Sequence, residues 1–343
     1  TTHEALGHDK LKPRGSNQIG MRQFNERVVL QAIRLRGSGS KADLARVTRL
    51  STQTVSLIID RLLSDELVAK LEPQRGKVGQ PSVPIALNPD GAFSIGIEIG
   101  RRSCDVLLVD FVGGVRERAQ LAYDYPDPET IFGYIQTQLA QLSQRLGGMS
   151  HRLHGIGIAA PLSLDGWQKL LGVAPERAQR WRDVDIARSV QAMTELPVEL
   201  VKDTTAACVA ELVAGRGRSI KSYLYVFFDT FVGGGLVIDS HLHTGLRGNA
   251  GAVGSMPMQQ AQAHSASPMQ FLGVASLFNL EQRYRAAGLQ VQASTDERAL
   301  QAPWAEHTEA WLALSANALA LVAHTANCLL DFDGVIVDGI MHR

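Results

Sequence analysis

Cysteine is scarce in this 343-residue chain, which holds only Cys104, Cys208 and Cys328, and no two of them form a CxxC motif. Neither a disulfide framework nor a cysteine-ligated zinc site is therefore indicated. Net charge is also lacking, because 34 lysines and arginines are balanced by 34 aspartates and glutamates. The first twenty residues are polar and contain no apolar run typical of a secretory signal.

An uninterrupted apolar run of membrane-spanning length is missing as well. The longest apolar segment, residues 311–330, is broken by Asn317, His324 and Asn327. It is expected to be a buried core helix, so no membrane partner is predicted. Reduced cysteines and the absence of a secretory signal predict a cytoplasmic location. A hydrophobic content of 45% over 343 residues is ample for two or three packed domains.

The balanced total charge hides an asymmetry along the chain. Residues 1–90 contain 14 lysines and arginines against 9 acidic residues, while residues 91–343 contain the remaining 20 against 25. A basic module joined to a mildly acidic body is typical of a protein in which only the first part meets phosphates. The turn-forming run Asn88-Pro-Asp-Gly91 marks the expected boundary. We therefore expect a flexible arm over 1–20 and a DNA-binding domain over 21–90.

Residues 40–67 predict two short helices joined by a tight turn, preceded by a supporting helix over 22–35. Ser40 and Ser51 are suitable N-caps, since a serine hydroxyl can accept a hydrogen bond from an unpaired helix N–H group. Residues 55, 58, 59, 62 and 63 are apolar and line one face of the second helix. Such a helix pair also occurs in ordinary helical bundles, so by itself it indicates DNA binding only weakly.

Two short apolar segments, 68–71 and 83–87, flank a turn-rich loop with a basic tip. They predict a β-hairpin, or wing, although a solvated surface hairpin would give the same pattern. Helices, turn and basic wing together favour a winged helix-turn-helix. Polar side chains at the start of the second helix are expected to meet base edges, and the wing is expected to meet phosphate or the minor groove. The candidate DNA-binding residues are Ser51, Thr52, Gln53, Thr54, Ser56, Arg75, Lys77 and Gln80.

The rest of the chain predicts a mixed α/β body in two lobes, over 91–201 and 202–343. Three strands open the first lobe over 93–100, 104–110 and 116–123, and helices and strands alternate after them. The second lobe begins with a helix at Asp203, followed by a strand over 223–228 and the glycine run 233–235. Long helices are expected from Met269 and Glu306. A cleft between two such lobes is where small ligands usually bind.

These segments, in this order, resemble the ROK family (repressors, open reading frames and kinases) in its transcriptional-regulator branch. The resemblance covers residues 15–338 and implies an actin/hexokinase-like fold, sugar binding in the cleft and DNA affinity controlled by that sugar. It also implies further helical residues after the last strand, so the C-terminal part is expected to be incomplete. The matching stretches include Leu50-Ser-Thr-Gln-Thr-Val-Ser56, Gly79-Gln-Pro81, Val201-Lys-Asp-Thr-Thr-Ala-Ala207 and Leu246-Arg-Gly-Asn-Ala-Gly251.

The phosphate loops depart from the pattern of the family's kinases. Their Asp-x-Gly-x-Thr loop reads Glu98-Ile-Gly-Arg-Arg102 here, and Phe231 stands where the second loop has a glycine. Bulky side chains are placed where backbone N–H groups would have to approach phosphate oxygens. Asp203 matches the family's catalytic base, but an N-cap or a hydrogen bond to a ligand hydroxyl explains it equally well. We therefore expect no catalytic residue and no cofactor.

The positions that the family uses for sugar differ too. Glu176 and Lys202 replace two asparagines, and Ala252-Val-Gly-Ser255 replaces a Glu-x-Gly-His motif. The family's zinc-binding cysteines are absent from residues 263–268, so no metal is predicted. The candidate ligand-binding residues are Glu176, Lys202, Asp203 and Asn249. They suit a different polyol, a sugar acid or a phosphorylated sugar, or else Lys202 and Glu176 pair with each other in an empty pocket.

The sequence thus predicts a homodimeric or homotetrameric repressor of carbohydrate uptake or catabolism genes. It would bind double-stranded DNA at a palindromic operator and respond to a small sugar-like effector. Two alternatives stay open. One is a sugar kinase of the same family, and the other is a regulator controlled by a protein partner with no small ligand.

Overall fold

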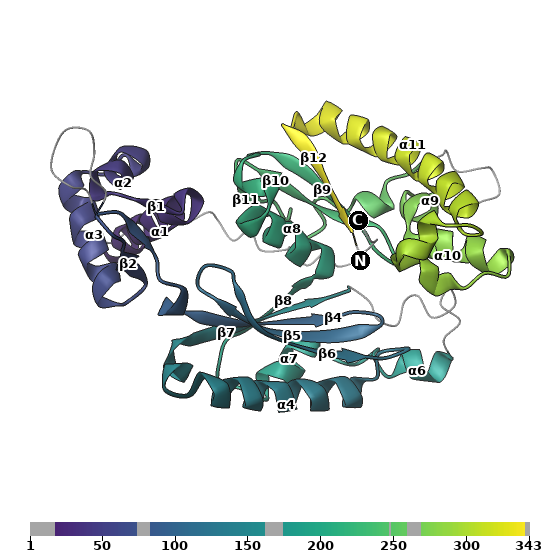
Figure 1. Cartoon of the computed structure of the whole chain (residues 1–343), viewed down its shortest axis with the longest axis horizontal. Helices are drawn as coiled ribbons and strands as arrows, with labels where there is room; N and C mark the ends of the chain where they lie inside the picture. The colour runs from purple at the N-terminus through teal and green to yellow at the C-terminus, as the bar shows by residue number, and fades with distance from the viewer. Residues whose placement is uncertain (1–17, 74–82, 162–173, 247, 259–268, 340–343) are drawn as a thin grey trace, which may run out of the picture. The chain divides into compact units, whose positions relative to one another are not determined.

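The computed structural model describes residues 18–73, 83–161, 174–246, 248–258 and 269–339. The chain divides into two compact units (Figure 1). Unit 1 comprises Thr1–Phe93 with Asp110–Gly114, and unit 2 comprises Ser94–Val109 with Val115–Arg343. The division falls at Phe93, just after the turn-forming run 88–91 and its short 3-10 helix η1 (Pro89–Gly91).

Unit 1 contains three helices and a small sheet. The helices are α1 (Gln18–Arg36), α2 (Lys41–Thr48) and α3 (Thr52–Ser64). The strands β1 (Ser38–Gly39), β2 (Val68–Lys70) and β3 (Ile85–Leu87) form an antiparallel sheet in the order β1-β3-β2. Ser40 and Ser51 cap α2 and α3 by accepting hydrogen bonds from the N–H groups of Asp43 at 3.1 Å and Thr54 at 3.0 Å. The predicted helix pair and both of its caps are confirmed.

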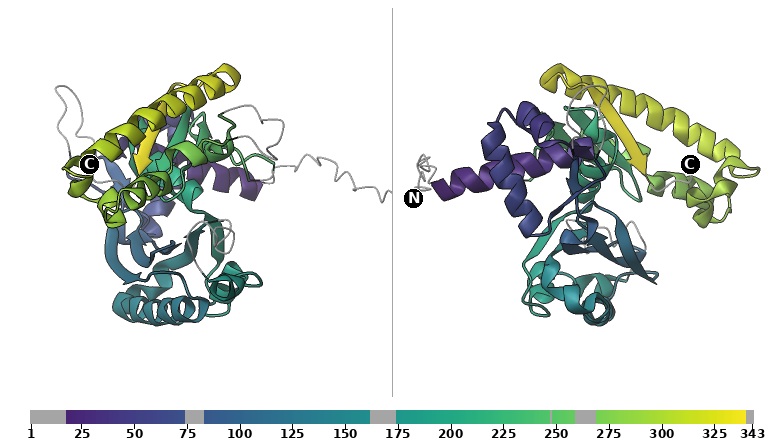
Figure 2. Two further views of the ribbon diagram at one scale, coloured as in Figure 1. Left: turned by 90° about the vertical axis from the view of Figure 1, so that its right-hand side faces the viewer. Right: turned by 60° about the vertical axis from the view of Figure 1, so that its left-hand side comes forward.

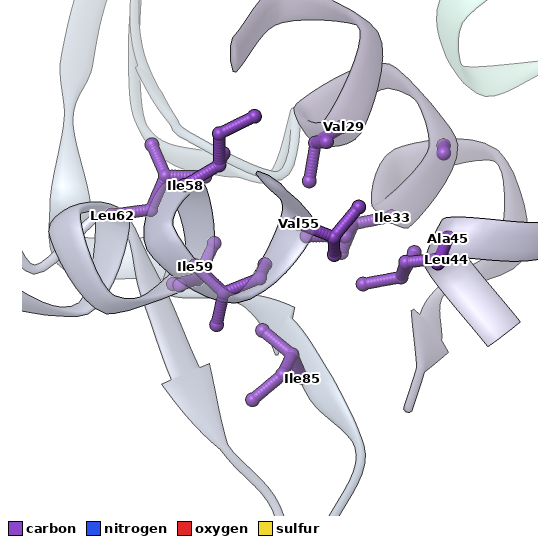
Figure 3. Packing of buried hydrophobic residues seen from close by; sticks show 11 residues of the cluster. Val29, Ile33, Leu44, Ala45, Val55, Ile58, Ile59, Leu62 and Ile85 are labelled. Atoms are coloured by element: carbon purple, nitrogen blue, oxygen red, sulfur yellow. The ribbon is translucent and has the colours of Figure 1, made fainter. Parts of the chain in front are cut away.

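The core of unit 1 explains which face of α3 is left exposed. Val55, Ile58, Ile59 and Leu62 of α3 are buried together with side chains from α1, α2 and β3 (Figure 3). These four residues recur at the spacing of one helical face, so the polar residues of the first turn point away from the core.

The first sheet of unit 2 has five strands in the order β6-β5-β4-β7-β8. They are β4 (Phe93–Ile99), β5 (Ser103–Asp110), β6 (Val115–Ala122), β7 (Leu153–Ala160) and β8 (Val198–Lys202), and β7 and β8 are parallel. Helix α4 (Pro128–Leu146), which lies along this sheet, buries an apolar stripe (Figure 1). The connections include η2 (Gly147–Arg152), α6 (Pro175–Gln179) and α7 (Ile186–Gln191).

The second sheet of unit 2 has four strands in the order β11-β10-β9-β12. They are β9 (Tyr223–Phe228), β10 (Gly233–Ile238), β11 (His241–Leu242) and β12 (Gly334–Gly339), and β12 pairs parallel to β9. Four helices accompany it: α8 (Asp203–Ala214), α9 (Leu272–Ala275), α10 (Leu277–Ala286) and α11 (Ala305–Leu330). Four 3-10 turns are η3 (Arg216–Arg218), η4 (Val253–Ser255), η5 (Val291–Thr295) and η6 (Glu297–Leu300).

Two expectations for the C-terminal helices are wrong. The long helix expected from Met269 is two short helices, because Ser276 between α9 and α10 has an extended backbone (φ −68°, ψ 148°). Helix α11, expected to be buried, packs only one stripe, including Trp311 and Val322, on the second sheet and its neighbours. Figure 2 shows the ribbon of this long yellow helix. Several leucines on α11 are exposed, among them Leu329 at 82%. Among the described residues, α11 is the one helix long and apolar enough to span a membrane, a property that core helices share.

Candidate functional site

The predicted base-contacting residues gather on the first turn of α3. Ser51, Thr52 and Gln53 are exposed, and Thr54 is half-buried. The hydroxyl of Ser51 is occupied by the cap and lies 2.8 Å from the Thr54 hydroxyl. Within the described part of the chain, the side chains of Thr52 and Gln53 make no hydrogen bond, so they are free to meet an outside partner.

Ser56 has a neighbour on another helix that was not among the predicted residues. The ammonium group of Lys41, the first residue of α2, donates hydrogen bonds to the Ser56 hydroxyl at 2.9 Å and to Asp60 at 2.7 Å. This contact places an ion pair, Lys41 with Asp60, beside the exposed face of α3. The two residues are 15 positions apart and on different helices, so no local sequence pattern indicates the contact.

The predicted wing is described only at its base. Strands β2 and β3 pair antiparallel, with Val68 opposite Leu87 and Lys70 opposite Ile85. Arg75, Lys77 and Gln80 lie in the loop between the strands, outside the described residues, and their role stays a prediction.

Unit 2 contains a cavity of about 250 Å³ at the start of α8. Its walls come from the turn after β4, the end of β8, the β9–β10 connection, η4 and α9. The charged side chains that line it are Arg101, Lys202 and Asp203, and the hydroxyl-bearing ones are Thr204 and Ser255. Close packing of the glycine run shapes the wall, since a Cβ atom on Gly233 would lie 2.6 Å from the Thr204 methyl group.

Arg101 and Phe231, the two bulky residues found in place of the family's phosphate loops, contact each other at this cavity. The guanidinium carbon of Arg101 lies 4.8 Å from the centre of the Phe231 ring, a cation–π distance. Burial lowers the pKa of Arg101, while the carboxylates of Asp229 and Asp203 oppose that shift. Burial likewise raises the pKa of Asp229, although a hydrogen bond from the Thr230 N–H and the charge of Arg101 act against it. The turn after β4 and the β9–β10 connection are therefore joined by the contact of Arg101 with the Phe231 ring and by the attraction between Arg101 and the carboxylate of Asp229.

The four predicted ligand-binding residues are not gathered in one place. Lys202 and Asp203 line the cavity, whereas Glu176 on α6 and Asn249 are exposed and do not. An ion pair between Lys202 and Glu176 does not form in the described part of the chain. Asp203 accepts a hydrogen bond from the Thr204 N–H at 2.7 Å. Thr204 was not among the predicted residues, and its buried hydroxyl has no hydrogen-bond partner within the described ranges.

Comparisons with known proteins concern mainly unit 2. A family model described as "ROK family" matches residues 94–343. The chain is 25% identical over 241 residues to the xylose repressor of Bacillus subtilis (strain 168), which covers 70% of this chain and 62% of the repressor. The match thus spans less than two thirds of that relative.

Two solved structures show the same fold. The first is described as a ROK family transcriptional regulator, a homologue of the Escherichia coli MLC protein. Its TM-score is 0.68 at 20% identity, covering 94% of this chain and 84% of that one. The second is described as a putative N-acetylmannosamine kinase from Listeria monocytogenes. Its TM-score is 0.56 at 19% identity, covering 72% of this chain and 83% of that one.

Proposed function

Since the chain belongs to the ROK family, we propose that it is a DNA-binding transcriptional repressor controlled by a sugar-like effector. The observation that carries the proposal is α3, a capped helix whose apolar face is buried in unit 1, while the side chains of Thr52 and Gln53 are exposed and make no hydrogen bond to the described residues. The similarity to a protein named xylose repressor supports it. A repressor of this kind acts in the cytoplasm, on carbohydrate uptake or catabolism genes.

Unit 1 is proposed to bind DNA as a winged helix-turn-helix. The side-chain amide of Gln53 can pair with the edge of an adenine, and Thr52 can contact either kind of base pair. Lys41 and the positive end of α3 would approach phosphates and set the position of the helix in the major groove. The loop between β2 and β3, with Arg75, Lys77 and Gln80, would contact phosphate or the minor groove. A palindromic operator would be bound by a homodimer or homotetramer.

Unit 2 is proposed to sense the effector. A ligand in the cavity would touch residues from both sheets, because Lys202 ends β8 and Phe231 follows β9. A second contact joins the first sheet to the helices that accompany the second sheet. Arg102 after β4 donates to both carboxylate oxygens of Glu281 on α10, at 3.0 and 3.1 Å. The effector would control DNA affinity by favouring one arrangement of the first sheet and the second sheet with its helices over another.

Sugar phosphorylation is not part of the proposal. The contact between Arg101 and Phe231 lies where the family's kinases need small residues beside phosphate oxygens, and a cavity of about 250 Å³ leaves little room for a nucleotide beside a sugar. Incubation with Mg-ATP and a panel of sugars should therefore give no turnover. Sugar-dependent ADP release would overturn this part of the proposal.

The DNA claim is tested by selecting a binding sequence from random duplexes with the full chain and measuring affinity by fluorescence anisotropy. Gln53→Ala should weaken binding to the selected duplex by about fivefold or more, because one good bidentate base contact is worth about 1–3 kcal/mol. Binding to an unrelated duplex should change little. The control is Gln136→Ala, an exposed glutamine on α4. An equal loss on both duplexes would refute base reading by Gln53.

A further inference from the structure

Two cations and one carboxylate line the cavity in unit 2. They are Arg101, Lys202 and Asp203. Arg101 is already engaged, since it contacts the Phe231 ring and interacts with the carboxylates of Asp229 and Asp203. Lys202 is therefore the cation of the lining that is left to meet a ligand.

Lys202 has no partner of its own in the described part of the chain. It is half-buried, and its ammonium group forms neither a hydrogen bond nor an ion pair there. The neighbouring carboxylate of Asp203 accepts from the Thr204 N–H instead. A half-buried ammonium group beside a cavity lacks part of its hydration, so an anion in the cavity would be its natural complement.

A second unmet group lies next to Lys202. Thr204 is only 5% exposed and lines the cavity, and its buried hydroxyl oxygen has no hydrogen-bond partner among the residues that the structure describes. It is the second residue of α8, a helix of 12 residues whose N-cap, Lys202, makes no side-chain capping bond. The positive end of the helix, the unpaired hydroxyl and the unpaired ammonium group all favour the same kind of ligand group.

The size of the cavity limits the ligand. Pockets for drug-sized molecules measure about 300–1,000 Å³. At about 250 Å³ this cavity suits a molecule of monosaccharide size. Ser255 and Asp203 on its wall can bond hydroxyl groups, which a polyol supplies in abundance.

We propose that the effector is a monosaccharide-sized polyol with one anionic group, a carboxylate or a phosphate, which Lys202 and Thr204 bind at the start of α8. This inference rests on the proposed function, because it names the chemical class of the effector that controls DNA binding. A neutral sugar, the class that the name of the xylose repressor suggests, is the competing outcome.

Isothermal titration of the full chain with matched sugars tests the proposal. The probes are D-glucose, D-glucuronate and D-glucose 6-phosphate, and D-xylose with D-xylonate, with inorganic phosphate as the bare anion. An anionic member should bind saturably and at least about tenfold more tightly than its neutral counterpart, as expected for a charge-assisted hydrogen bond. Tighter binding of glucuronate or xylonate identifies the anionic group as a carboxylate. Tighter binding of glucose 6-phosphate identifies it as a phosphate.

Three variants make the test specific. Lys202→Gln and Thr204→Val should each weaken binding of the anionic probe, Lys202→Gln by about tenfold or more. Lys221→Gln, at an exposed lysine outside the cavity lining, should leave it unchanged. Thermal unfolding verifies that each variant is folded. Tighter binding of a neutral sugar, no binding by any probe, or equal effects of Lys202→Gln and Lys221→Gln would each overturn the proposal.

DNA affinity is measured on the same samples with the selected duplex. Retained DNA binding without an anion effect would reject only the effector class. Failure of the chain to recognise any duplex would instead reject the proposed function, whatever the titrations show.

Discussion

Ile59 on α3 offers a way to separate the two units experimentally. Its side chain is fully buried among residues of α1, α2 and β3 (Figure 3). Replacing Ile59 with alanine removes three carbon atoms, which costs about 2.4 kcal/mol at about 0.8 kcal/mol for each group taken from water. Incomplete collapse of the remaining space raises the loss to about 3–4 kcal/mol.

That loss is large for a unit with one small core. A single core in fewer than about 70–80 residues rarely supplies more than about 3–5 kcal/mol. Ile59→Ala should therefore unfold most of unit 1 while unit 2 stays folded, because unit 2 has its own cores. Hydrogen exchange should show loss of protection in α3 and retained protection in β9. DNA binding should disappear, and thermal unfolding of unit 2 should be unchanged.

Leu57 provides the matched control on the same helix. It is 64% exposed, so Leu57→Ala should change the free energy of unfolding of unit 1 by no more than about 0.5 kcal/mol. Similar losses for the two variants would refute the assignment of α3's faces. Simultaneous unfolding of both units in Ile59→Ala would refute their independence.

Three further predictions concern single residues. Arg49 has a left-handed backbone (φ 58°), so Arg49→Gly should stabilise unit 1 by about 0.5–1 kcal/mol in urea unfolding. Arg46→Gly, inside α2, should destabilise unit 1 by a similar amount. A change of the same sign in the free energy of unfolding for both variants would contradict the prediction. Arg102→Met should destabilise unit 2 by about 1–2 kcal/mol because it strands the buried carboxylate of Glu281, and a double-mutant cycle with Glu281→Gln should show coupling between the two. A hydrogen bond from the serine that caps α2 lowers the pKa of Asp43 below 3.8. The stability from this carboxylate is present above pH 3.8 and lost as pH falls through the folded-state pKa, so Asp43→Asn should cost more in unfolding experiments at pH 7 than at pH 3.

Local patterns were sufficient to predict the helices of unit 1. Ser40 and Ser51 cap where they were expected to, because capping depends on neighbours within three residues. The buried face of α3 follows from the spacing of its apolar residues. The contact of Lys41 with Ser56 and Asp60 was not predictable, because it depends on the angle at which α2 and α3 pack.

The burial of α11 shows a different limit of sequence reasoning. Its residues are apolar on nearly all sides, which suggests complete burial, yet the sheet and helices beside it cover only one stripe. Periodicity cannot identify the covered stripe when every stripe is apolar. Similarly, motif matching placed Glu176 and Lys202 in one ligand set, but Glu176 lies on α6 and outside the cavity lining.

Arg101 and Phe231 illustrate what a motif comparison misses when each position is judged alone. Each is a departure from a kinase loop, and each by itself reads as the loss of a phosphate site. In the structure they contact each other across 130 positions of sequence, and the carboxylates of Asp229 and Asp203 oppose the lowering of the pKa of Arg101 by burial. A pocket that had only lost its ligand would not need a half-buried cation held by an aromatic ring and two carboxylates, because taking such a charge from water is costly. The pair therefore supports a site rebuilt for binding, in which Lys202 and Thr204 are left to meet the effector.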